Sequence, residues 1–369
     1  MSSRSQTNLP TPEPKKGCCS WWMIVLTVVL LAVVGVLVWQ FAPWKEAAEK
    51  VIPGFGDSLA PTPVPDPNSP PPTPLPPFTE CESTDNCCNS LDTICDLRVN
   101  EVLFAGTHNS FSSADAGFRF PLGNHLLKIE DQLKAGYRGI NLDMCGCAGD
   151  LVLCHASCLI TRKTNVVFEA MVSFLDANPS ETLLVTMELN PDLDQPVDLS
   201  VVYADMEATT GFVDYLYVHP DANTEWPTLR ELRDSNKRML VFHYRGPVCT
   251  DTDPCPDGLH YWFEHAFETP FQFSTVDAIT SDYSESCSVD RGGGGSRKFF
   301  GVNHFTSIAF QNRAEDLGTA AMLERRIDEC STLQNQPVSV LSLDFWSKTD
   351  LIQVVQDHNK ALAQRRAAL

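Results

Sequence analysis

Two histidines follow short apolar runs and lie 47 residues apart, so they are expected on different structural elements. His108 stands in Gly106-Thr107-His108-Asn109, and His155 stands in "LVLCHA". Histidine changes its charge close to neutral pH, so one imidazole can take a proton from an attacking group while another gives a proton to a leaving group. The pair suits a general base and a general acid, although a single histidine at such a position is often only a core or rim residue.

Oxygen-bearing side chains follow apolar runs of the same kind elsewhere in the chain. Carboxylate and amide oxygens are the ligands of hard cations such as Ca²⁺, whereas nitrogen and sulfur ligands select other metals. The candidate ligands for such an ion are Asn109, Asn141, Asp143 and Glu188. A cation beside two acid–base histidines predicts displacement at phosphorus, because negative charge builds on the phosphoryl oxygens in the transition state.

The elements that must position these residues are apolar, β-branched strands that alternate with helical patterns. We expect strands at 99–106, 137–144, 151–155, 181–189, 238–244, 298–305 and 338–346. We expect helices at 167–175, 228–236 and 349–363. Strands that are buried on both faces and separated by helices pair in parallel, so the pattern predicts an α/β barrel, with an open doubly wound sheet as the alternative.

Polar residues gather at the carboxyl ends of the expected strands. In a parallel barrel these ends meet on one face, where barrel enzymes hold their sites. Beyond the residues named above, the polar residues at or just after these ends are His243, Arg245, Asn303, His304 and Asp344. The pattern predicts one shared pocket, in which we take His243, Arg245 and Asn303 as candidate substrate-binding residues.

The composition limits the class of partner. The chain of 369 residues is 43% hydrophobic, which is enough for one large core of barrel size. After residue 50 it carries 22 Lys and Arg against 44 Asp and Glu. This acidic balance argues against nucleic acid, since phosphates require a basic surface. It also argues against docking to anionic lipid through a basic patch, so contact with a membrane requires a different kind of attachment.

A membrane attachment is expected near the N-terminus, where a long run of residues carries no charge. The run can span about 30 Å of hydrocarbon as a helix. We expect a short tail at 1–20, an uncleaved transmembrane anchor at 21–43 and a Pro-rich linker at 44–78. A cleaved signal peptide is the alternative interpretation. Slightly more basic residues precede the span than follow it, which predicts a single-pass type II orientation.

Twelve of the 14 cysteines follow the expected anchor. Their number is even, and their clusters lack the CxxC…CxxC spacing of a zinc site. We therefore expect disulfides, with a Cys-rich segment at 79–98 ahead of a catalytic barrel at 99–369, in a lumenal or extracellular compartment. A disulfide between Cys145 and Cys158 is expected to fix the loop that carries His155.

Three groups of residues resemble the X region of phosphatidylinositol-specific phospholipase C, a distorted TIM barrel among the PLC-like phosphodiesterases. They are "GTHNS", "GYRGINLDM" followed by "LCHA", and "NPSETLLVTMEL", and the resemblance runs from about residue 99 to about residue 359. It implies that His108 assists the attack of the inositol 2-hydroxyl on phosphorus and that His155 protonates the diacylglycerol oxygen. It also implies an orienting or polarising role for Asp344 and calcium ligands at Asn109, Asp143 and Glu188.

Two positions distinguish branches of that family. Asp143 stands where metal-independent bacterial members have arginine, so the calcium-dependent branch is the better match. Asn141 stands where calcium-dependent eukaryotic members usually have glutamate, which leaves one negative ligand fewer. We therefore expect calcium-assisted cleavage of a membrane phospholipid.

The choice of substrate is left with alternatives. Few cations are expected in the pocket, which favours phosphatidylinositol or a glycosylphosphatidylinositol. One alternative is a phosphodiesterase for another headgroup, such as that of sphingomyelin, and the other is a barrel, weak or inactive as an enzyme, that serves as a tethered binding module. No protein partner follows from the sequence.

Overall fold

In the computed structural model of the chain, the described residues are 81, 86–189, 196–221, 224–244, 255–293 and 297–368. The expected tail, anchor and Pro-rich linker at 1–78 lie outside these ranges, as does Arg245. Within the described ranges, no helix is both long and apolar enough to cross a membrane. The spanning helix at 21–43 therefore stays a prediction.

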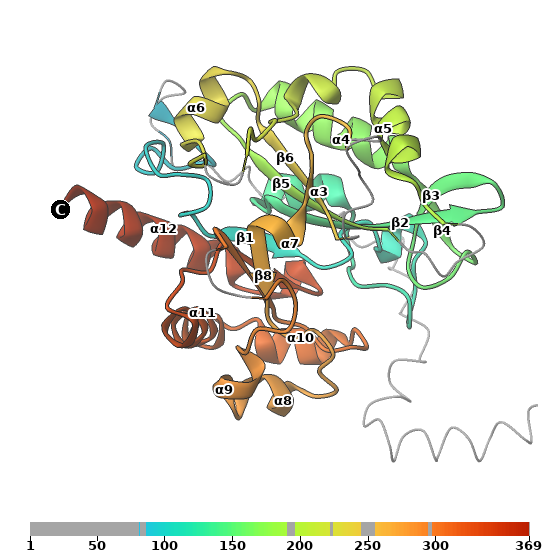
Figure 1. The fold of residues 1–369 in the computed structure, drawn as a ribbon. Coiled ribbons are helices and arrows are strands. Elements are labelled where there is room, and N and C mark those ends of the chain that lie inside the picture. The colour runs from blue at the N-terminus through green and yellow to red at the C-terminus, as the bar shows by residue number, and fades with distance from the viewer. Residues whose placement is uncertain are drawn as a thin grey trace, which may run out of the picture. The chain divides into compact units, whose positions relative to one another are not determined.

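Parallel strands form the centre of the described fold (Figure 1). They are β1 (Phe104–Thr107), β2 (Gly139–Cys147), β5 (Leu183–Leu189), β6 (Met239–His243), β7 (Leu259–Tyr261), β8 (Ala266–Glu268), β9 (Phe299–Asn303) and β10 (Val340–Leu343). Their order is β7-β6-β5-β2-β1-β10-β9-β8, and each neighbouring pair is parallel. β7 and β8 are the first and last strands of this order, and among the described residues they do not pair with each other. The sheet therefore stays open, and the fold is a parallel half-barrel. The predicted α/β class is confirmed, and the predicted distorted TIM barrel is seen as this open half-barrel.

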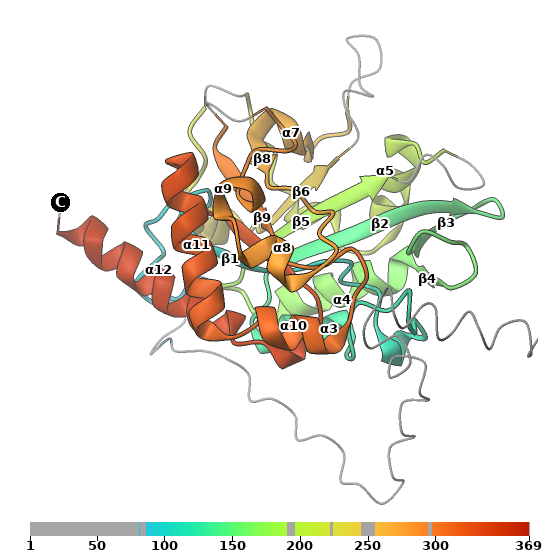
Figure 2. The same cartoon turned by 90° about the horizontal axis from the view of Figure 1, so that it is seen from below.

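Two further strands form a hairpin extension that the sequence prediction assigned wrongly. β3 (Asp150–Cys154) pairs antiparallel with the end of β2, and β4 (Thr161–Lys163) pairs antiparallel with β3. We expected 151–155 to be a strand of the barrel. Ala148 and Gly149, both with positive φ, instead form a two-residue turn that folds the chain back along β2. Figures 1 and 2 show β2 and β3 extending together beyond the rest of the sheet.

Helices cover the outer face of the sheet in two groups (Figure 2). α3, α4 and α5 pack on the side of β2, β5 and β6, and α11 and α12 pack on the side of β1, β9 and β10. The expected helices at 167–175, 228–236 and 349–363 are confirmed: the first lies within α4, the second includes α6, and the third overlaps α12. The helices are α3 (Ile129–Ala135), α4 (Thr164–Ala177), α5 (Leu199–Ala208), α6 (Leu229–Asp234), α7 (Trp262–His265), α8 (Val276–Thr280), α9 (Tyr283–Ser286), α10 (Gln311–Leu317), α11 (Ala320–Gln334) and α12 (Leu351–Ala367), with 3₁₀ turns η2 (Ala114–Ala116), η3 (Val213–Tyr215) and η4 (Trp346–Lys348).

The inner face of the sheet is apolar toward the amino ends of the strands and polar toward their carboxyl ends. The apolar part includes Phe104, Leu184 and Phe299, and the Cys-rich segment packs Leu91 and Leu97 against the same cluster. Residues 86–98 are therefore part of the core of the half-barrel and not a separate appendage.

Five disulfides join pairs of described cysteines: Cys81–Cys87, Cys88–Cys95, Cys145–Cys154, Cys147–Cys158 and Cys287–Cys330. Cys255 is disulfide-bonded as well. The prediction that most cysteines after the anchor are paired is thus confirmed for the described residues. The predicted pair of Cys145 with Cys158 is wrong, because the hairpin register places Met144 opposite Leu153 and so brings Cys145 next to Cys154.

Candidate active site

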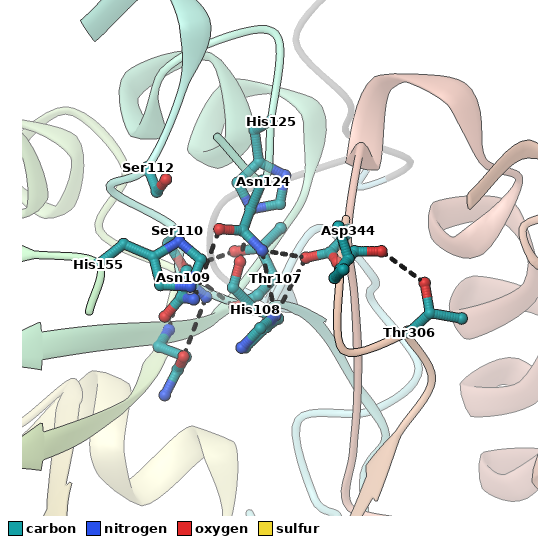
Figure 3. Close-up of polar contacts among 12 residues, drawn as sticks. Thr107, His108, Asn109, Ser110, Ser112, Asn124, His125, His155, Thr306 and Asp344 are labelled. Carbon is teal, nitrogen blue, oxygen red and sulfur yellow. Dashed lines mark hydrogen bonds and ion pairs between the residues drawn. The ribbon is translucent and has the colours of Figure 1, made fainter. Parts of the chain in front are cut away.

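His108 and Asp344 come together just after the ends of the neighbouring strands β1 and β10 (Figure 3). His108 Nδ1 lies 3.1 Å from Oδ1 of Asp344, whose carboxylate is buried. Asn124 donates from Nδ2 to the same oxygen at 2.9 Å. The His108 ring also stacks on Phe305, with ring centroids 3.7 Å apart. With its Nδ1–H donated to the carboxylate, neutral His108 keeps the Nε2 lone pair for a substrate proton.

The turn after β1 is held by hydrogen bonds and by an asparagine in the left-handed region. Asn109 has a φ of 48°, a conformation that asparagine adopts more readily than most residues. Its backbone N–H donates to Asn141 Oδ1 at 2.9 Å, and the Asn141 N–H donates to Ser110 Oγ at 2.9 Å. His125 donates from Nε2 to the His108 carbonyl oxygen at 2.7 Å. These hydrogen bonds hold the backbone of His108 and Asn109 in place beside β2.

His155 reaches the site from the hairpin extension and not from a strand of the barrel. It follows β3 directly and lies between two cysteines that are cross-linked to β2. Its Nδ1 donates to the Leu122 carbonyl oxygen at 2.8 Å. Burial lowers the pKa of His155; the bond to Leu122 opposes this shift, and the charges of His108 and Asp344 act in opposite directions. The two histidines are thus close enough to interact electrostatically.

Asp143 and Glu188 are direct neighbours on β2 and β5. The parallel register pairs Asp143 with Glu188 and Asn141 with Thr186, so these side chains share the inner face of the sheet. Burial raises the pKa of Asp143 well above its usual range, and the charge of Glu188 raises it further. Two carboxylates in this position are therefore stabilised by a proton or by a cation.

The amide of Asn109 lies between His108 and the Asp143 carboxylate. When its nitrogen faces Asp143, it donates to the two carboxylate oxygens at 3.2 and 3.1 Å, and its oxygen accepts from His108 Nε2 at 3.2 Å. When its oxygen faces Asp143 instead, the contact is favourable only with a proton or a cation between the oxygens. The first orientation satisfies both atoms of the amide without an ion, whereas the second would suit a hard cation held by Asn109, Asp143 and Glu188.

Such a cation site would depend on amide oxygens as well as on carboxylates. Within the described ranges, no three His, Cys, Asp or Glu side chains are grouped so that they could hold a metal ion. Asn141 is partly committed elsewhere, since its oxygen accepts from the Asn109 N–H and its nitrogen donates to Thr186 Oγ1 at 3.3 Å. The donor set is correct for calcium in type but poor in negative charge.

A cavity inside the half-barrel adjoins these residues, and sequence analysis missed part of its lining. Its polar lining residues are Asn141, Thr186, Tyr244, Glu268, Asn303 and Ser342. Glu268 accepts from Trp262 Nε1 at 2.6 Å and from Arg291 Nη2 at 2.5 Å. Asn303, which was predicted, donates from Nδ2 to the Thr269 carbonyl oxygen at 2.9 Å. The signal for Glu268 is the short run "AFE", an apolar pair before an acid, which is too brief to predict a strand.

Two residues at predicted strand ends do not join the site. The register of β6 pairs His243 with Met187, so His243 lies on the outer face of the sheet, and its predicted role in substrate binding is corrected. His304 is buried and donates from Nε2 to the Leu317 carbonyl oxygen at 3.0 Å. Successive side chains of a strand alternate between its faces, so proximity to a strand end does not ensure that a residue faces the pocket. Arg245 lies outside the described residues.

Comparisons with known proteins found similar sequences over most of this chain. A family model described as PI-PLC X 1 matches residues 94–359. "PI-PLC X domain-containing protein 1" from Arthroderma benhamiae is 28% identical over 301 residues, which cover 74% of this chain and 90% of that protein. An "Uncharacterized secreted protein" from the same organism is 21% identical over 290 residues, which cover 70% of this chain and 60% of that protein.

Among solved structures, the phosphatidylinositol-specific phospholipase C from Listeria monocytogenes is similar, with a TM-score of 0.51 at 18% identity. The similarity covers 75% of this chain and 98% of that one. At this level of identity the likeness shows a shared fold.

Proposed function

The chain belongs to the PI-PLC X domain family and has the PLC-like phosphodiesterase fold, and on this basis we propose that it is a membrane-anchored phosphoric diester hydrolase. Its proposed reaction breaks the glycerol–phosphate bond of phosphatidylinositol or of a glycosylphosphatidylinositol. The inositol 2-hydroxyl oxygen bonds to phosphorus, and the diacylglycerol oxygen leaves. The products are diacylglycerol and a cyclic inositol phosphate.

One observation carries this proposal: His108 and His155, which come from different elements, have their ring nitrogens fixed by separate acceptors in one site. Asp344 accepts from His108 Nδ1, so that Nε2 of His108 takes the hydroxyl proton. The Leu122 carbonyl accepts from His155 Nδ1, so that protonated His155 can give its Nε2 proton to the leaving oxygen. In this assignment one proton is taken and one is given in each cleavage.

A calcium ion is part of the proposal. Asn109, Asp143 and Glu188 would hold it, with Asn141 beside them, since the Asn109 amide lies next to the Asp143 carboxylate and Glu188 neighbours Asp143. When bound, the ion would supply positive charge against the phosphate, whose approach two carboxylates would otherwise oppose. The family resemblance to the calcium-dependent branch supports the same assignment.

The charges around the cavity favour a headgroup without extra phosphates. Arg291 is paired with Glu268, which lines the cavity, and its guanidinium lies 4.3 Å from the centroid of the Phe271 ring. A paired arginine attracts a further phosphate less than a free one does. This pairing supports phosphatidylinositol or a glycosylphosphatidylinositol over a polyphosphoinositide.

The proposed location is the outer or lumenal side of a membrane. The disulfides and the similarity to a secreted protein indicate an oxidising, extracellular type of compartment. The predicted anchor at 21–43 would then hold the catalytic part at the membrane in a type II orientation.

The test is hydrolysis of defined lipids by the full-length protein in mixed micelles, with calcium or with excess chelator. We expect diacylglycerol from phosphatidylinositol or a glycosylphosphatidylinositol, and turnover roughly 10²–10⁴-fold lower in His108→Ala and in His155→Ala. Product from sphingomyelin alone would shift the assignment to another headgroup. Binding of phosphatidylinositol vesicles without any hydrolysis would favour a tethered binding module.

A further inference from the structure

One short segment, residues 122–125, contacts both candidate catalytic histidines. It lies in the loop between η2 and α3 and belongs to no strand of the half-barrel. The Leu122 carbonyl oxygen accepts from His155 Nδ1 at 2.8 Å, and His125 Nε2 donates to the His108 carbonyl oxygen at 2.7 Å. Residues 122–125 therefore connect the hairpin extension, which carries His155, to the turn after β1, which carries His108.

Asn124 is the residue of this segment whose side chain contacts both Asp344 and His108. Its side chain is buried, and its Nδ2 donates to Asp344 Oδ1 at 2.9 Å and lies 3.3 Å from His108 Nδ1. Its Oδ1 lies 3.4 Å from the Asn109 side-chain amide. Figure 3 shows Asn124 between Asn109 and Asp344, above His108.

The backbone of Asn124 holds the same carboxylate from a second direction. Its carbonyl oxygen accepts from the Phe345 N–H at 2.8 Å. Phe345 follows Asp344 directly and has a φ of 46°, a left-handed conformation that a large residue adopts only when its surroundings impose it. Asn124 thus constrains both the side chain of Asp344 and the backbone just after it.

We propose that Asn124 is a positioning residue for the proposed reaction, and that residues 122–125 set the geometry between the base and the acid. Asp344 Oδ1 accepts from two donors on different elements, Asn124 Nδ2 and His108 Nδ1, and two fixed donors define the orientation of a carboxylate. This orientation keeps His108 in the tautomer that carries its proton on Nδ1. The inference rests on the proposed function for its effect on turnover, but its effect on the His108 tautomer is independent of any reaction.

The experiment compares Asn124→Ala and Asn124→Asp with Asn359→Ala in the full-length protein. Asn359 is a matched control, since it is also a buried asparagine with two 2.9 Å hydrogen bonds, to the Leu103 N–H and carbonyl, outside the site. Asn124→Asp keeps the side-chain volume and removes the donor, so it carries the test if the alanine variant does not fold. Each variant is assayed for kcat and KM on phosphatidylinositol, and the His108 tautomer is read from ¹⁵N shifts, with His108→Gln to identify the signal.

We expect kcat of both Asn124 variants to fall roughly 10–100-fold below that of Asn359→Ala, with KM changed by less than about two-fold. We also expect the Nδ1–H tautomer of His108 to lose its dominance. A kcat equal to that of the control, or an unchanged His108 tautomer, would overturn the inference. A wild-type protein that cleaves no lipid would overturn the proposed function alone, since the tautomer measurement would still decide the role of Asn124.

Discussion

Replacing Asp344 by asparagine should slow turnover far more than it weakens substrate binding. The carboxylate is buried and lies 3.1 Å from His108 Nδ1, where it can stabilise the positive charge that His108 gains with the substrate proton. For unit charges at this distance and an effective dielectric constant of about 20, the attraction is about 5 kcal/mol. This energy corresponds to a limit of roughly 10⁴-fold in rate, so we expect kcat to fall by roughly 10³–10⁴-fold.

The assay is a four-variant cycle in the full-length protein on phosphatidylinositol micelles with calcium. It compares wild type, Asp344→Asn, His108→Ala and the double variant. Because Asp344 acts through His108, the double variant should be no slower than His108→Ala alone. Asp350→Asn is the control, since it removes the same charge from a residue whose carboxylate caps α11 by accepting from the Ala320 N–H at 3.0 Å. A loss below about ten-fold in Asp344→Asn, or losses that multiply in the double variant, would refute the reasoning.

Three further predictions address the acid, the cation and the fold. His155→Ala should lower turnover by roughly 10²–10⁴-fold without changing thermal unfolding, and cleavage at the wild-type rate would remove its role as acid. Asp143→Asn should raise the calcium concentration needed for half-maximal activity and Asn141→Glu should lower it, because the site loses or gains one formal charge; full activity of all forms in excess chelator would contradict this. Acid should destabilise the fold as the pH falls from 6.5 toward about 4, because burial lowers the pKa of His265 to about 4 and the unfolded histidine binds its proton first. Urea unfolding at about pH 7 and pH 5 measures this loss, which should shrink in His265→Phe; equal stability of wild type at both pH values would speak against it.

Long, strongly apolar strands and amphipathic helices could be predicted from the sequence because their periodicity is visible over many residues. β2 and β5 and the buried face of α4 are of this kind. β7 and β8 are only three residues long, so neither gives a period that a sequence pattern can show. The open side of the sheet between them was for that reason not foreseen.

The residue types of the site could be predicted, but not every direction in which they point. His108 and Asp344 lie just after the ends of β1 and β10, and Asp143 lies near the end of the parallel pairing of β2 with β5. Topology alone brings side chains together at such ends. His155 was identified on the wrong kind of strand, since only the two-residue turn after β2 shows that β3 runs back. Asn124 lies in an irregular loop, and no local pattern relates such a loop to a strand end some 220 residues away.

The hairpin that carries His155 makes the placement of the proposed acid depend on oxidation. Its two disulfides join the stretch around His155 to β2, whereas the parallel sheet is built without them. A newly made chain with reduced cysteines could therefore form the half-barrel while its acid is not yet held in place. Such a chain would be an inactive precursor, and its activity would begin only after its disulfides have formed. Refolding with and without reductant would reveal the difference.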